Sequence, residues 1–193
     1  MKRLFVLIIL LLAQFVSAQV HLGLRDNRYA SIGYHFLDKY DIKLEHSMFP
    51  EKIGFQYVRA NAEASFSIEQ LMISQKIYFG MLYNQNFYDV GADLKMDYTL
   101  LNRIDLFADV NPHYDSGYEY ETNYGAGTSI RLYRGMWIVV QYTTVPEYRM
   151  SEKRIRAGFI FRENNLSVSP EISVPAKKEF KSMRVLVSMD YSL

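Results

Sequence analysis

Charged side chains of opposite sign fall into two consecutive blocks of this 193-residue sequence. In the first block, from Gln85 to Glu121, only Lys95 and Arg103 are basic. Its acids are Asp89, Asp93, Asp97, Asp105, Asp109, Asp115, Glu119 and Glu121. In the second block, up to position 162, the bases are Arg131, Arg134, Arg149, Lys153, Arg154, Arg156 and Arg162. Carboxylates and guanidinium groups form charge-assisted hydrogen bonds, and unpaired groups set the potential of the water beside them. The two blocks are therefore compatible with ion pairs between them, or with an acidic and a basic wall on opposite sides of a polar cavity.

The segment from Pro112 to Ser116 holds the three residue types of a hydrolytic site, in His113, Asp115 and Ser116. Nucleophilic catalysis needs such side chains within hydrogen-bond reach of one another. In an extended chain only His113 and Asp115 would lie on one face. We interpret the segment as a polar outer loop. A lipid-modifying or proteolytic enzyme is the alternative, and convergence of the three side chains would favour it.

Features that would indicate metal, cofactor or nucleic-acid chemistry are missing from the sequence. Histidine occurs only at His21, His35, His46 and His113, and cysteine is absent. No His-Glu-x-x-His spacing and no Gly-rich phosphate loop occur. The 22 basic and 21 acidic residues nearly balance, so net charge does not favour nucleic acid. We expect no metal site, no cofactor and no nucleic-acid partner.

The stretch Phe87–Leu100 shows how such charges can be positioned, because its residues alternate with a period of two. Apolar residues fill the even positions from Tyr88 to Tyr98, and the odd positions hold Asp89, Gly91, Asp93, Lys95 and Asp97. Successive side chains of a β-strand point to opposite faces. Ten steps span about 33 Å, and a tilt of about 40° leaves about 25 Å, the height of the apolar band of an outer-membrane barrel. The pattern predicts a membrane-spanning strand with tyrosine girdles.

Similar alternation recurs along the rest of the chain and predicts twelve strands. They cover Val20–Arg25, Tyr29–Phe36, Tyr40–Met48, Ile53–Phe66, Leu71–Tyr83, Phe87–Leu100, Arg103–Val110, Tyr118–Leu132, Met136–Thr144, Arg154–Arg162, Leu166–Val174 and Phe180–Leu193. We predict an all-β fold, a single closed antiparallel transmembrane β-barrel. Pro170 weakens the eleventh strand because proline cannot donate to a ladder. Without the weaker segments the barrel would have ten or eight strands.

Connection lengths provide an internal check on the strand number. A barrel with both chain ends in the periplasm has its odd-numbered connections outside, where loops are longer. Odd connections at 111–117, 145–153 and 175–179 are longer than the even ones near Asp38, Tyr133 and Asn164. This parity fits twelve strands.

The amino-terminal segment has the pattern of a secretory signal. Lys2 and Arg3 precede the apolar run Leu4–Leu12, and the small residues Ser17 and Ala18 resemble a cleavage site. A transmembrane anchor would need about 20 apolar residues. We expect residues 1–18 to be a cleaved signal peptide and residues 19–193 to form the barrel domain. The expected location is the outer membrane of a Gram-negative bacterium, reached by export through the inner membrane.

The final stretch resembles the last strand of outer-membrane barrel proteins as a class. Its apolar face carries Met183, Val185, Val187, Met189, Tyr191 and Leu193. In that class the strand usually ends in phenylalanine, whereas here Tyr191 is followed by Leu193. The resemblance is particularly to small barrels of Bacteroidota. It implies outer-membrane lipid and the assembly machinery, which reads the last strand, as partners.

The inward charges are the candidate functional residues. They are Asp89, Asp93, Asp97, Asp105, Asp109, Glu119, Glu121, Arg131, Arg154, Arg156 and Arg162. Paired across the lumen they would fill the barrel, and unpaired they would line a pore for an ion or small solute. We predict a non-enzymatic narrow channel or an envelope-structural or assembly component. Besides the barrel enzyme, the alternative is a soluble exported β-sandwich binding protein, whose apolar faces would form an internal core.

Overall fold

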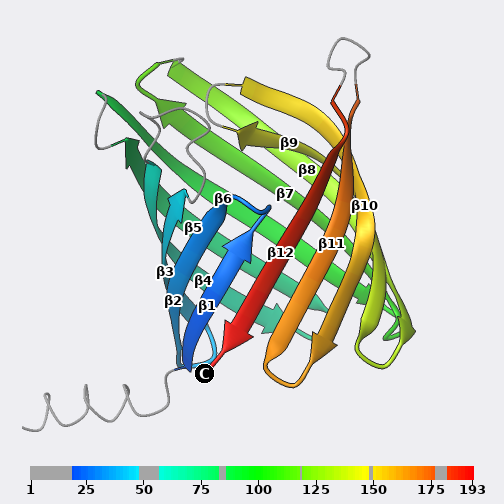
Figure 1. Cartoon of the computed structure of the whole chain (residues 1–193). Helices are drawn as coiled ribbons and strands as arrows, with labels where there is room; N and C mark the ends of the chain where they lie inside the picture. Colours follow the sequence, from blue (N-terminus) through cyan, green and yellow to red (C-terminus); the bar gives the residue numbers. More distant parts are fainter. Residues whose placement is uncertain (1–18, 48–56, 83–85, 118, 148–149, 177–181) are drawn as a thin grey trace, which may run out of the picture.

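The computed structural model describes residues 19–47, 57–82, 86–117, 119–147, 150–176 and 182–193. Within them twelve antiparallel strands close into one barrel, in which β1 pairs with both β2 and β12 (Figure 1). The predicted all-β closed barrel of twelve strands is therefore confirmed. The expected signal peptide, residues 1–18, lies outside the described residues. No helix in the described part of the chain is long and apolar enough to cross a membrane.

The strands follow one another around the barrel in sequence order. They are β1 Gln19–Arg25, β2 Tyr29–Phe36, β3 Tyr40–Ser47, β4 Tyr57–Ile68, β5 Leu71–Leu82, β6 Phe87–Leu100, β7 Ile104–Asp115, β8 Glu119–Tyr133, β9 Met136–Glu147, β10 Met150–Glu163, β11 Leu166–Pro175 and β12 Arg184–Ser192. Most bounds lie within a few residues of the prediction, because alternation marks where each strand becomes amphipathic.

The largest difference lies in β7, where residues 111–115 continue the strand instead of forming an outer loop. Pro112 has no N–H, and the β6–β7 register pauses between the pairs Gly91↔His113 and Leu94↔Val110. The side-chain amide of Asn111 donates to the carbonyl oxygen of Ala92 at 2.9 Å. A side chain thus supplies a donor where the proline interrupts the ladder, and the strand continues.

Pro170 has a comparable effect on β11. The register with β10 pauses between Gly158↔Glu171 and Phe161↔Val168, and it resumes unchanged. On the other side the pairing with β12 is continuous and includes Pro170↔Val187. The weak eleventh segment is therefore a full strand of the barrel, and the ten- and eight-strand alternatives are wrong.

Tight turns set the register at several hairpins. Asp26 and Asn27 have φ of 54° and 58°, and Leu37 and Asp38 have φ of 55° and 53°. Two adjacent residues with positive φ are typical of type I′ turns, whose twist matches that of the paired strands. We call the barrel end with the connections 37–39, 69–70, 101–103, 134–135 and 164–165 the turn end, and the opposite end the loop end. Both ends of the barrel sheet lie at the turn end, where the N–H of Leu193 donates to the oxygen of Val20 at 2.8 Å.

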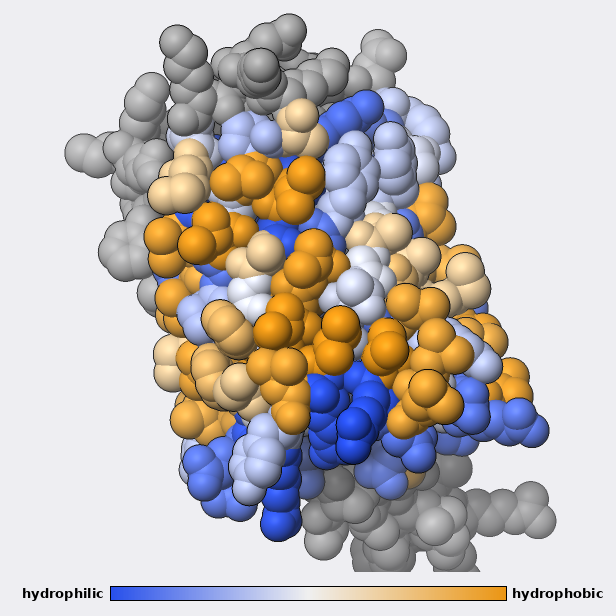
Figure 2. Space-filling view, turned by 90° about the vertical axis from the view of Figure 1, so that its right-hand side faces the viewer, coloured by the Kyte–Doolittle hydropathy of each residue, from blue (hydrophilic) through white to orange (hydrophobic). Residues whose placement is uncertain are grey.

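The two faces of the sheet have opposite character. On β6, Tyr88 and Leu94 are 44% and 37% exposed, whereas the inward Asp89 is 7% exposed. Figure 2 shows apolar side chains over the middle of the outer surface and hydrophilic side chains gathered below them. Buried side chains inside the barrel are mainly polar. A β-sandwich has an apolar interior, so this distribution excludes the sandwich alternative.

Candidate functional site in the barrel lumen

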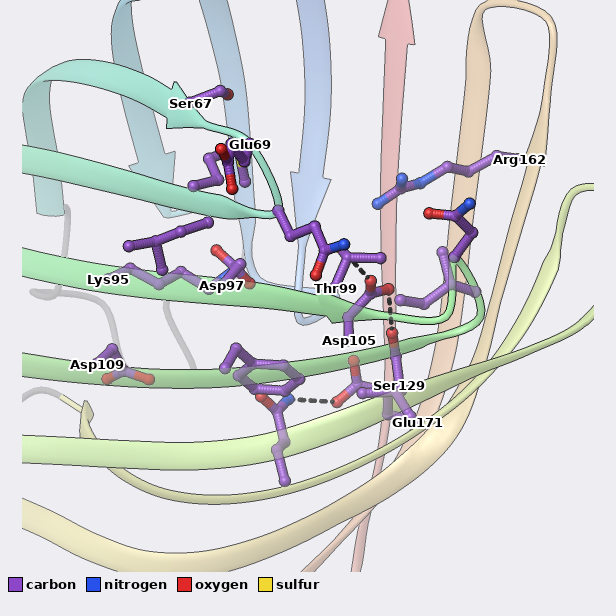
Figure 3. Close-up of a pocket in the computed structure, with 18 residues that line it drawn as sticks. Ser67, Glu69, Lys95, Asp97, Thr99, Asp105, Asp109, Ser129, Arg162 and Glu171 are labelled. Atoms are coloured by element: carbon purple, nitrogen blue, oxygen red, sulfur yellow. Dashed lines mark hydrogen bonds and ion pairs between the residues drawn. The ribbon is translucent and has the colours of Figure 1, made fainter.

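A cavity of about 680 Å³ lies inside the barrel toward the turn end. Its charged lining residues are Glu69, Lys95, Asp97, Asp105, Asp109, Arg162 and Glu171. Figure 3 shows Asp97, Asp105 and Asp109 on the β6–β7 wall, with Arg162 reaching in from β10. Five acids face two bases here, so this chamber, which we call the acidic chamber, has a negative potential.

Two further cavities adjoin the acidic chamber. One of about 510 Å³ lies at the turn end and shares Thr99, Asn102, Asp105 and Arg162 with the chamber. The other, of about 290 Å³, extends along the lumen toward the loop end and shares only Asp109 with the chamber. The three cavities therefore adjoin one another inside the barrel, and Asp109 is the lining residue common to the acidic chamber and the 290 Å³ cavity.

The acids of the first block interact with near neighbours. Asp93 on β6 forms an ion pair with Lys76, its register partner on β5, and the Lys76 Nζ atom lies 2.7 Å from the carboxylate oxygen. Lys95 pairs with Asp97 on the same strand at 2.8 Å. Asp105 accepts hydrogen bonds from the hydroxyls of Thr99 and Ser129 at 2.8 and 2.9 Å. These contacts hold the carboxylates against their own wall of the lumen.

Asp89 belongs to a compact network near the loop end. Its carboxylate accepts a hydrogen bond from the hydroxyl of Tyr57 at 2.6 Å and another from Arg59 at 2.9 Å. Arg59 also donates to the Tyr57 oxygen at 2.7 Å and lies 4.3 Å from the centroid of the Tyr78 ring. Burial makes such a fully paired network rigid, because breaking one bond leaves a charge without its partner.

The arginines of the second block differ in burial. Arg154 is 1% exposed and donates to the hydroxyl of Ser173 at 2.7 Å and to the carbonyl of Ser182 at 2.9 Å. Arg156 donates to both oxygens of Asp26, in the β1–β2 turn, at 3.1 and 3.3 Å. Arg156 is therefore paired across β11 and β12, with an acid outside the acidic block.

Arg131 and Arg162 lie at the turn end and are exposed to the cavities. Their guanidinium carbons lie 5.3 and 5.2 Å from the centroid of the Trp137 ring. Together with Arg103 they line the 510 Å³ cavity, where Asp105 is the acid. The turn-end mouth of the lumen is thus basic and precedes the acidic chamber.

Two of the predicted acids lie on β8. Glu121 is the register partner of His113, so the two share the inward face. Glu119 is the register partner of Asp115. Five further charged residues of the lumen are not among the predicted functional charges: Arg25, Asp26, Glu45, Arg59 and Glu171. Alternation on β4 and β11 could have indicated Arg59 and Glu171, whereas the inward position of Asp26 depends on the turn.

The three residue types of a hydrolase do not converge within the described residues. His113 and Asp115 belong to β7 and are buried, whereas Ser116 lies in the following turn. The Nδ1 atom of His113 is 3.1 Å from the side-chain amide of Asn123, and the Ser116 hydroxyl accepts a hydrogen bond from the backbone of Tyr88. The Asp115 carboxylate accepts from the N–H of Gly117. This geometry does not favour the barrel-enzyme alternative.

Comparison with solved structures places the fold among known barrels. A KdgM porin, solved in complex with disordered oligogalacturonate, aligns over 91% of this chain and 98% of its own with a TM-score of 0.67. A second KdgM porin structure aligns over the same shares with a TM-score of 0.64. The fold is that of the KdgM porins. Sequence identity is 8% in both cases, so the likeness concerns the fold. No protein-family model matches the chain, and no curated protein does.

Proposed function

We propose that the protein is a narrow diffusion channel of the Gram-negative outer membrane that passes small hydrophilic solutes and ions. The observation that carries this proposal is a closed barrel with an apolar outer face and adjoining polar cavities inside it. A closed barrel leaves no unpaired sheet edge in lipid, and a polar lumen accommodates water. The protein binds outer-membrane lipid through its apolar band, and it is not an enzyme.

Export and assembly follow from the same proposal. Residues 1–18 act as a cleaved signal peptide, and the assembly machinery recognises β12, which places the turn end in the periplasm. The short turns at that end match the short periplasmic turns of outer-membrane barrels.

The charges along the lumen support a preference for neutral or weakly cationic solutes. The KdgM structure holds an oligogalacturonate, which is a polyanion. In this protein the acidic chamber would repel such a ligand, because its lining carries five acids and two bases. Over all three cavities, acids and bases are nearly balanced. The channel is therefore weakly selective, with the acidic chamber opposing anions.

A second candidate function is an envelope-structural barrel whose lumen is filled. The buried Arg154 and Arg156 and the network of Tyr57, Arg59 and Asp89 favour it, because they pack polar side chains across the loop end. The two functions differ in whether water and solutes pass between the two cavities that Asp109 lines.

Liposome swelling with neutral sugars of increasing size distinguishes the two. The channel predicts swelling with small sugars, an abrupt size limit, and a larger limit in the Asp109→Ala variant, because this residue lines both cavities. The matched control is Glu63→Ala, which borders one cavity only and should keep the size limit. If protein that is folded, as judged by faster gel migration before boiling, gave no swelling, the filled barrel would be favoured.

A further inference from the structure

Three potential metal ligands meet inside the barrel at the turn end. His21, His35 and Asp41 come from the neighbouring strands β1, β2 and β3, and each offers a ligand atom within 4.8 Å of the other two. His35 and Asp41 are direct register partners, and His21 lies one strand further on. The topology thus gathers two imidazoles and one carboxylate on one inward patch.

The hydrogen bonds of His21 leave one ring nitrogen available. Its Nδ1 atom lies 2.9 Å from the Ser192 hydroxyl and 3.5 Å from the Asp190 carboxylate. Its Nε2 atom is buried and has no hydrogen-bond partner. A buried polar atom without a partner is costly. Metal-binding histidines commonly donate their other N–H to a carboxylate, a backbone carbonyl or water, which orients the ring.

We infer that His21, His35 and Asp41 bind a divalent transition-metal ion, best represented by Zn²⁺. Imidazole and carboxylate ligands suit zinc, and Zn–N and Zn–O bonds are about 2.0–2.2 Å long. Ligand atoms around a tetrahedral ion at that distance lie about 3.4 Å apart, so small side-chain rotations from the present spacing suffice. Ser192 and Asp190 hold the His21 ring in the ligating orientation.

The site leaves one coordination position open to the lumen. Three protein ligands leave a fourth position for water or a solute group. Asp41 lines the 290 Å³ cavity, so an ion bound here faces that cavity. The ion also links β1, β2 and β3, which have 7, 8 and 8 residues and are the shortest strands described. Binding therefore stabilises the part of the barrel with the fewest ladder hydrogen bonds, whether or not the lumen conducts.

The test is calorimetric titration of Zn²⁺ into chelator-treated, refolded protein in detergent micelles. We expect one ion per chain and a thermal midpoint that rises with Zn²⁺ concentration. His21→Ala, His35→Ala and Asp41→Asn should each weaken binding at least tenfold. Asp190→Asn should weaken it about tenfold or more, as is typical when a partner of a ligating histidine is lost. His46→Ala is the matched control, since His46 is an exposed histidine on the same strand as Asp41.

Each variant is first checked for the unboiled gel shift of a folded barrel, and the glutamine variant of the same histidine replaces any alanine variant that fails this check. Absence of saturable binding below millimolar Zn²⁺ would overturn the inference. Equal Zn²⁺ affinity in the wild type and all three ligand variants would also overturn it. Loss of binding in the His21 variant alone would overturn it too, because His35 and Asp41 would then not be ligands. Loss in the ligand variants with retention in His46→Ala supports the site.

Discussion

Burial separates the arginines of the lumen into two kinds with different roles. Arg156 is buried and pairs with Asp26, whereas Arg162 is exposed to two cavities and contacts the Trp137 ring. Breaking a buried ion pair costs about 3–5 kcal/mol, and an exposed charge contributes under about 1 kcal/mol. Arginine thus stabilises the barrel at position 156, whereas at position 162 it sets the electrostatic potential of the lumen.

Arg156→Ala should lower the free energy of unfolding by about 3 kcal/mol, the lower end of the range for buried pairs. The lower end applies because Arg25 remains 3.8 Å from Asp26. Arg162→Ala is the matched control and should change the free energy of unfolding by under about 1 kcal/mol. Urea unfolding in micelles measures both. Equal effects of the two substitutions would contradict the assignment of Arg156 to a buried pair.

Leu94→Arg should cost about 2–4 kcal/mol, because Leu94 lies on the apolar outer face near the middle of β6 and arginine at the bilayer midplane costs that much. Lys95→Arg places the same side chain one residue further on, on the inward face, and should be nearly neutral. Unfolding titrations in lipid vesicles compare the two variants. A neutral Leu94→Arg would mean that this face does not contact lipid.

The charges of the lumen could be predicted from alternation, but their partners could not. Asp93 pairs with Lys76 on the adjacent strand, and the partner of Arg156 is 130 positions away in a turn. The proposed metal ligands show the same limit. His35 and Asp41 flank a hairpin turn, so their pairing follows once the turn is known, whereas His21 joins them only because β1 pairs with β2.

At the scale of the strand, alternation predicted twelve elements because the outer face must be apolar and the inner face polar. The predicted β7 was too short, because Asn111 compensates for Pro112 with a side-chain hydrogen bond that has no sequence signature. The sequence also made β11 look weak, although both neighbours of this strand pair with it around Pro170. Proline ends a strand only where nothing compensates for its missing N–H.

Gly158→Ala should destabilise the barrel by about 1–3 kcal/mol, the usual cost of inserting a methyl group into a packed site. A Cβ atom at Gly158 would meet the backbone oxygen of Pro170, which cannot move without separating β10 and β11. At Gly33 the nearest atoms lie 3.5 Å away, so Gly33→Ala is the control and should be tolerated. Urea unfolding in micelles compares them, and equal stability would show that β10 and β11 adjust freely at Pro170.

For the whole molecule, the adjoining cavities decide between a channel and a filled barrel. The loop end is packed with paired charges, and the turn end holds the larger cavities. The sequence predicted a barrel with mixed charges inside, since pattern alone sets which residues face inward. It could not predict how much of the lumen stays open, because that depends on where each long side chain lies.

The most direct test of the channel is the reversal potential of single channels in planar bilayers under a KCl gradient at about 0.1 M salt, where screening is moderate. We predict discrete conductance steps with weak selectivity in the wild type, and a shift toward cations in Arg162→Ala, because this cation lines both the acidic chamber and the basic mouth. Folded protein that gives no conductance steps, or an Arg162→Ala variant with an unchanged reversal potential, would contradict a water-filled path through these cavities.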